Sequence, residues 1–134
     1  MDLSRFSRNE MLIGGESVEK LSRCHVAVFG LGGVGSYTAE ALARAGVGEL
    51  TVIDNDKVAI TNINRQLYAL SSTVGMKKTQ VAAARIKDIN PDCKVNIIDG
   101  FYLEENSADF FENRYDYMAV SYTHLRAHET SQDL

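Results

Sequence analysis

Alternating apolar and polar segments along the chain predict an α/β protein organised around one strand–helix–strand unit. An apolar run from Val26 to Phe29 suits a buried parallel strand. Apolar positions with helical spacing follow it, and a second apolar run from Leu50 to Ile53 ends at Asp54. This order is the unit from which parallel sheets with flanking helices are built, so we expect a mostly parallel sheet.

The same patterning predicts further elements on both sides of this unit. Helices are expected over residues 2–13, 16–23, 73–90 and 104–113, and strands over residues 94–99 and 115–120. The stretch between residues 54 and 70 is dense in polar residues, and one interpretation of it is a capped loop followed by a short helix that begins near Asn64.

A complete GxGxxG motif lies between the first strand and its helix, as Gly30-Leu31-Gly32-Gly33-Val34-Gly35. In this motif the first glycine permits a tight turn, the second lets a phosphate approach the backbone, and the third lets helix and strand pack closely. The helix N-terminus then offers free N–H groups to an anion. Asp54, 19 residues after Gly35, is placed to accept hydrogen bonds from ribose hydroxyls. We therefore predict a nucleotide-binding, Rossmann-like fold, incomplete at its C-terminus.

Three regions follow from this pattern. We expect a helical N-terminal arm over residues 1–23 and a partial nucleotide-binding domain over residues 24–120. The last segment, residues 121–134 (SYTHLRAHETSQDL), is polar and has no apolar period. It resembles a translated sequencing-adapter remnant, so we expect the natural chain to diverge at or just after Val120.

Two polar segments bear on which nucleotide binds. Acids, amides and an arginine crowd the stretch after the second strand: Asp54, Asp56, Asn62, Asn64, Arg65 and Gln66. A hydride-transfer enzyme needs no such cluster, whereas planar arginine donors suit the oxygens of a triphosphate. The alternative is that the amides cap a loop and a short helix. Lys77 and Lys78 lie in the first turn of a predicted helix, where cations oppose the helix dipole, which either a bound phosphate or a solvated lysine pair would explain.

Composition excludes several classes of protein. The 134 residues suffice for one domain with a core, and the 45% hydrophobic and 24% charged content is ordinary for a globular protein. A net charge of −4 gives no general attraction to nucleic acid, although Lys77, Lys78, Lys87, Arg85 and Arg44 remain candidates for a local patch. Cys24 and Cys93 form no CxxC pair, so neither a zinc site nor a disulfide framework is expected. No apolar run reaches the length of a membrane span, and we expect a cytoplasmic protein.

Taken together, GLGGVGS (30–36), DNDKVAITNINRQ (54–66) and GMKK (75–78) resemble the adenylating family of ubiquitin-activating-like enzymes. The arm RFSRNEMLIG and the segment RIKDINPDCKV are most similar to one branch, the tRNA threonylcarbamoyladenosine dehydratases. The resemblance runs from residue 4 to about residue 120. It implies an ATP- and Mg²⁺-dependent reaction in which a carboxylate of the modified tRNA attacks the α-phosphate of ATP. Cyclisation with net loss of water follows.

The resemblance also implies roles for individual residues. It assigns nucleotide binding to Gly30, Gly32, Gly33, Gly35, Asp54, Asp56, Asn62 and Gln66. It assigns catalytic contacts with the phosphates to Arg65, Lys78 and Arg8. Arg8 matches an arm arginine that reaches the γ-phosphate in the partner subunit, which implies a homodimer.

One departure from the family pattern affects the expected activity. The family has a magnesium-binding aspartate in an acidic motif after the fourth strand, where this chain has SYTHLRAHET. We therefore assign no metal ligand, and expect the chain as written to bind ATP weakly and not to turn over. Three alternatives stay open: adenylation of the C-terminal glycine of a sulfur-carrier partner, an NAD-dependent oxidoreductase, and a non-catalytic nucleotide-binding dimer.

Overall fold

The computed structural model describes residues 4–100 and 115–121. Its elements, in chain order, are η1 (Ser4–Phe6), α1 (Ser7–Ile13), α2 (Gly15–Leu21), β1 (His25–Phe29), α3 (Gly33–Ala45), β2 (Glu49–Ile53), η2 (Ile60–Asn62), α4 (Lys78–Ile89), β3 (Lys94–Ile98) and β4 (Tyr117–Val120). The helix predicted over residues 104–113 and the segment after residue 121 lie outside the described residues. No helix in the described part of the chain is long and apolar enough to cross a membrane.

The four strands form one parallel sheet in the order β3-β2-β1-β4. The register aligns Phe29 with Ile53 and with Val120, and Ile53 with Ile98. The carboxyl ends of all four strands therefore meet at one edge, which is where parallel α/β sheets bind ligands. The predicted Rossmann-like parallel sheet with flanking helices is confirmed.

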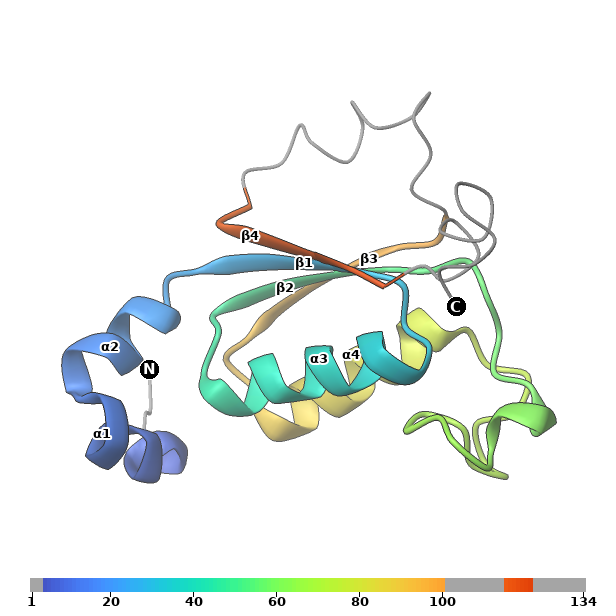
Figure 1. Cartoon of the computed structure of the whole chain (residues 1–134), viewed down its shortest axis with the longest axis horizontal. Helices are drawn as coiled ribbons and strands as arrows, with labels where there is room; N and C mark the ends of the chain where they lie inside the picture. The colour runs from blue at the N-terminus through green and yellow to red at the C-terminus, as the bar shows by residue number, and fades with distance from the viewer. Residues whose placement is uncertain (1–3, 101–114, 122–134) are drawn as a thin grey trace, which may run out of the picture.

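Helices α3 and α4 pack on one face of the sheet and against each other (Figure 1). Their contact with the sheet is apolar, and its buried residues include Val28, Leu50, Val52, Ala39, Ala43, Val81, Ala82 and Ile86. Each fully buried Val, Leu or Ile contributes roughly 1.5–3 kcal/mol relative to an exposed position. On the opposite face Ala27, Phe29 and Ile53 are buried, so β1 is apolar on both sides, whereas β2 has the polar residue Thr51 buried beside Ile53 on that face.

A bidentate ion pair also joins the two helices. Arg85 of α4 donates from Nε and Nη2 to the two carboxylate oxygens of Glu40 on α3, at 2.7 and 3.0 Å. Arg44 Nη2 approaches the same carboxylate at 3.2 Å. The hydrogen bond from Arg85 lowers the pKa of Glu40 below its usual value. Since both arginines are already paired, they are poor candidates for the local nucleic-acid patch.

The predicted start of the helix over residues 73–90 is wrong. Helix α4 begins at Lys78 rather than at residue 73, because the preceding residues pair with the segment after β2: Gly75 N–H donates to Val58 O, and Val58 N–H donates to Met76 O. Gly75 adopts a positive φ of 90°, which ends any helical course there. The short helix near Asn64 that one interpretation offered is not formed, and the 3₁₀ turn η2 lies just before that position.

The N-terminal arm consists of α1 and α2, which meet at Gly14 with a positive φ of 89°. This confirms the predicted helix break. Phe6 and Val18 are buried and attach the arm to the domain. The arm precedes β1 and lies on the far left of Figure 1, away from the carboxyl ends of the strands.

Candidate nucleotide-binding site

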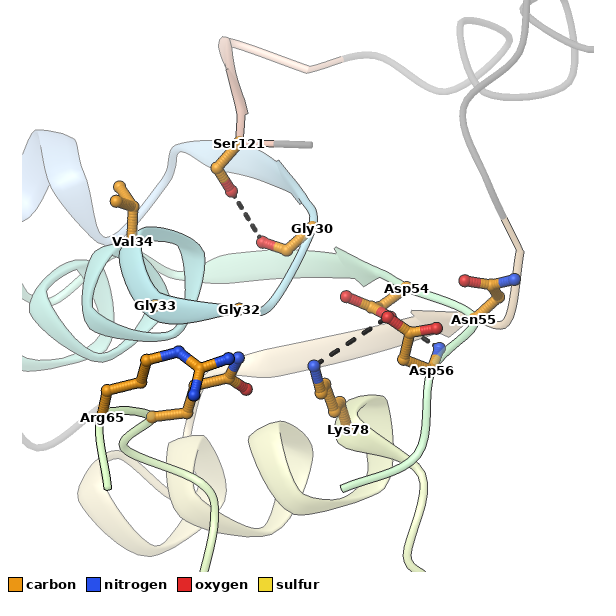
Figure 2. Close-up of a pocket in the computed structure, with 11 residues that line it drawn as sticks. Gly30, Gly32, Gly33, Val34, Asp54, Asn55, Asp56, Arg65, Lys78 and Ser121 are labelled. Atoms are coloured by element: carbon orange, nitrogen blue, oxygen red, sulfur yellow. Dashed lines mark hydrogen bonds and ion pairs between the residues drawn. The ribbon is translucent and has the colours of Figure 1, made fainter. Parts of the chain in front are cut away.

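A pocket of about 330 Å³ lies at the carboxyl edge of the sheet (Figure 2). Its lining comes from the β1–α3 turn, the segment after β2, the loop before α4, the start of α4 and the end of β4: Gly30, Gly32, Gly33, Val34, Asp54, Asn55, Asp56, Arg65, Gln66, Lys78 and Ser121. The structure thus gathers most of the predicted site residues in one place. Gly35, Asn62 and Arg8 are the predicted residues that do not line it.

Each position in the β1–α3 turn requires or permits glycine for a different structural reason. Gly30 has a φ of 94°, which few other residues adopt. At Gly32 an added Cβ would meet only Gln66 Nε2 at 3.8 Å, and at Gly33 nothing within 4 Å, so the backbone at the start of α3 is open to an anion. At Gly35 a Cβ would lie 1.6 Å from Gly30 O. Gly35 therefore permits the close approach of α3 to β1 and does not itself face the pocket.

Asp54 ties the glycine turn to the segment after β2. Its side chain is buried, with the residue only 5% exposed. Oδ2 accepts a hydrogen bond from Leu31 N–H at 2.7 Å, and Oδ1 accepts one from Asp56 N–H at 2.6 Å. A carboxylate has room for further donors. Asp54 thus shapes the pocket whether or not it also binds a ribose, and the predicted ribose contact stays a prediction.

Lys78 is the cation on the α4 side of the pocket. It is the first residue of α4, its side chain is only 7% exposed, and its Nζ lies 3.9 Å from Asp56 Oδ2. Lys78 N–H also donates to Asp56 O at 3.0 Å. Asp56, by contrast, has a 61% exposed side chain. Figure 2 shows the Lys78 side chain extending toward Asp56, so the pair places a largely buried ammonium group in the lining of the pocket.

Arg65 supplies a second cation from the loop before α4. Its Nη1 donates to Thr61 O and to Asn64 Oδ1, both at 3.0 Å, which holds the guanidinium beside the pocket. Gln66 follows it and lines the same wall. Asn62 instead uses its Oδ1 to accept a hydrogen bond from Ala59 N–H at 3.0 Å. Asn62 therefore takes the capping role that the sequence left open, and the structure does not place it in the pocket.

Arg8 lies on the arm, at the opposite end of the strands from the pocket. It lines a separate hollow between the arm and the ends of α3 and α4, together with Arg5, Arg44 and Asp88. Within one chain, Arg8 is therefore not brought together with Arg65 and Lys78. Its predicted contact with a partner subunit stays a prediction.

Val34, Asn55 and Ser121 line the pocket but were missed by the sequence reasoning. Val34 lies within the GxGxxG motif and Asn55 lies between Asp54 and Asp56, but only the glycines and the two aspartates were assigned to the site. Ser121 directly follows β4, and its Oγ donates to Phe29 O at 3.1 Å and to Gly30 O at 2.9 Å. Its position at the end of a parallel strand could have identified it, had the residue not been grouped with the polar segment after Val120.

Comparison with known proteins identifies the family. The sequence pattern of the ThiF family matches residues 6–122. The chain belongs to the ThiF family. This membership favours the adenylating interpretations of the pocket over the NAD-dependent oxidoreductase.

Within this family, the similar proteins include tRNA threonylcarbamoyladenosine dehydratases. The chain is 54% identical over 116 residues to the tRNA threonylcarbamoyladenosine dehydratase of Bacillus subtilis, covering 87% of this chain and 46% of that protein. The crystal structure of the Escherichia coli tRNA threonylcarbamoyladenosine dehydratase with ATP superimposes with a TM-score of 0.88 at 42% identity. The match covers 90% of this chain and 49% of that one, and a structure of the same protein with AMP gives a TM-score of 0.86. The chain thus spans about half the length of the relatives it matches.

Proposed function

We propose that this chain carries the ATP-binding part of a tRNA threonylcarbamoyladenosine dehydratase. The observation that supports this most is the pocket itself, which combines an open glycine turn with Arg65 and buried Lys78 in a ThiF-family fold. The identity to dehydratases over most of the chain supports the choice of this branch. No feature of the described residues favours the sulfur-carrier alternative, which stays a prediction.

The proposed chemistry solves a leaving-group problem. A carboxylate oxygen of the modified adenosine attacks the α-phosphorus of ATP, the bond to the bridging oxygen breaks, and pyrophosphate leaves. An internal nucleophile then attacks the carboxyl carbon, and AMP leaves with the former carboxylate oxygen, so one water is lost overall. Negative charge shifts between phosphate oxygens in the first step, and fixed cations stabilise it. Arg65 and Lys78 are the side chains that we assign to this task.

The residues of the pocket are compatible with a nucleotide. Backbone N–H groups at the start of α3 suit a phosphate, because nothing would lie within 4 Å of a Cβ at Gly33. Mg²⁺ is a further part of the proposal. No group of three possible metal ligands occurs within residues 4–100 and 115–121, so the phosphates would supply most of its ligands, with Asp56, which lines the pocket and has an exposed side chain, as a candidate carboxylate ligand.

A homodimer is the proposed assembly. Arg8 lies outside the pocket of its own chain, and the apolar side chains of Met11 and Leu12 on the same arm are exposed. Both observations fit an arm that packs on a second copy and delivers Arg8 to its nucleotide. Light scattering of the purified chain would report a mass of one copy if this idea is wrong. Location in the cytoplasm stays a prediction from the sequence.

Nucleotide binding by the 134-residue chain tests the proposal. We expect calorimetry to detect ATP binding and no binding of NAD at equal concentration. Replacing Arg65 or Lys78 with Ala should each weaken ATP binding about tenfold, the usual effect of losing one charge-assisted contact. Preference for NAD, or ATP affinity unchanged in both variants, would contradict the assignment. Asp92→Ala, an exposed position beyond the far end of α4, is the control.

A further inference from the structure

Two adjacent lysines begin α4, and the structure gives them different surroundings. Lys77 precedes the first helical residue, and its side chain is 47% exposed and lies 3.3 Å from Asp99, measured from Nζ to Oδ2. Lys78 has a 7% exposed side chain and lines the pocket. The helix pattern alone does not distinguish the two lysines, whereas the family resemblance assigns the phosphate contact to Lys78. The two lysines also have different acidic partners, because Lys77 pairs with Asp99 and Lys78 pairs with Asp56.

Asp99 has a fixed position at the end of β3. The backbone on both sides of it is bonded to Asp54, since Asp54 N–H donates to Ile98 O and Gly100 N–H donates to Asp54 O, each at 3.2 Å. Asp99 is therefore anchored to the residue that shapes the pocket. Its second carboxylate oxygen, Oδ1, accepts a hydrogen bond of 2.6 Å from Thr79 Oγ1, and Thr79 is completely buried.

Asp99 contacts the two residues that flank the pocket lysine in the sequence. Asp99 holds Lys77 through one oxygen and Thr79 through the other, and Lys78 lies between them in the chain. Two cations at a helix N-terminus oppose the helix dipole and repel each other. A carboxylate at that place offsets both effects, and it draws the ammonium group of Lys77 away from the pocket.

We propose that Asp99 is a positioning residue of the nucleotide site. By holding Lys77 and Thr79, it fixes the first turn of α4 so that Lys78 alone is presented to the phosphates. This inference rests on the proposed function, because it takes nucleotide phosphates as the ligand of Lys78. The position of the Lys78 ammonium group in the pocket then depends on Asp99, which lies 21 positions away in the sequence.

A double-mutant cycle on the 134-residue chain tests the coupling, with ATP affinity measured by calorimetry. Asp99→Ala should weaken ATP binding about fivefold, and in a Lys78→Ala background the same change should have almost no further effect, because it acts through Lys78. Asp99→Asn keeps an acceptor for Thr79 but loses the charge that holds Lys77. Its ATP affinity should therefore lie between those of the wild type and Asp99→Ala. If Asp99→Ala weakens ATP binding by the same factor in the wild type and in the Lys78→Ala background, the proposal is overturned.

Lysine acetylation followed by peptide mass spectrometry provides a test without nucleotide. In the wild type, exposed Lys77 should react faster than Lys78, and Asp99→Ala should raise the rate at Lys78 about threefold by loosening the first turn. Asp92→Ala is the matched control and should leave both rates unchanged. Circular dichroism establishes that each variant is folded, and Asp99→Asn replaces Asp99→Ala in this test if the latter is not.

The two tests separate the possible failures. If the wild-type chain does not bind ATP, the proposed function fails, while the acetylation rates still decide whether Asp99 positions Lys78. If ATP binds but Lys78 reacts equally in the wild type and in the folded Asp99 variant, the positioning role is wrong and the proposed function stands.

Discussion

The contact between Gly35 and Gly30 yields the most demanding prediction about the glycine turn. A Cβ at position 35 would lie 1.6 Å from Gly30 O and 2.7 Å from Gly30 C, both of them backbone atoms that cannot rotate away. Relief requires α3 to move off β1 by more than 1 Å, which would open the contacts of Ala39 and Ala43 with the sheet. We therefore expect Gly35→Ala to reduce the free energy of unfolding by about 3 kcal/mol, at the upper end of overpacking effects.

Gly33→Ala provides the matched control, two residues earlier in the same helical turn. Nothing lies within 4 Å of its added Cβ, and its φ is not positive. Alanine favours helix over glycine, so this variant should keep or gain about 0.5 kcal/mol of stability. Urea unfolding followed by circular dichroism measures both. Equal stability of the two variants would refute the reasoning, because the same substitution would then be insensitive to a backbone contact.

Further predictions concern the helix pair, the pocket and the thiols. Arg85→Ala should lower stability by about 1–2 kcal/mol, because it removes two charged hydrogen bonds to a largely buried carboxylate; thermal unfolding measures this. Since the pKa of Glu40 is lowered in the folded state, its contribution to stability is present above the ordinary carboxyl pKa of 4.5 and is lost as the pH falls through the folded pKa. In Arg85→Ala that acid-dependent loss should be smaller, which urea unfolding at several pH values would detect. Arg65→Ala should leave the melting temperature unchanged, because Arg65 is exposed, and a large drop would contradict a purely ligand-directed role. Burial raises the pKa of the Cys93 thiol to about 11, so a thiol reagent at pH 8 should modify Cys24 and spare Cys93 until the chain unfolds.

Much of the fold was predictable because its information is local. The run from Val26 to Asp54 contains a strand, a glycine turn, a helix and a second strand in direct succession, and each is specified by its own residues. The start of α4 was not predictable in this way. Residues 73–77 are compatible with a helix by composition, but hydrogen bonds between Val58, Gly75 and Met76 hold them against a segment many positions earlier. Such pairing overrides a weak local preference.

The pocket residues likewise divide into those that local sequence identifies and those that only the three-dimensional structure identifies. Gly30, Asp54 and Lys78 could be identified from the sequence because motifs place them at turns and strand ends. Asn62 has the same polar character and the same motif context, yet its amide caps the turn at Ala59, and only the three-dimensional structure separates the two uses. A polar residue in a loop can meet either the backbone or a ligand, and composition does not decide between them.

The arrangement around Asp54 explains why the site needs contacts from several strand ends. Its carboxylate fixes Leu31 in the glycine turn and Asp56 after β2, while its backbone bonds to both sides of Asp99 after β3. Asp56 and Asp99 in turn contact the two lysines that begin α4. Displacing any of these carboxylates would shift the cation and the glycine turn relative to each other. The site therefore depends on neighbouring strands being in register, because parallel pairing brings the three aspartates to one edge of the sheet.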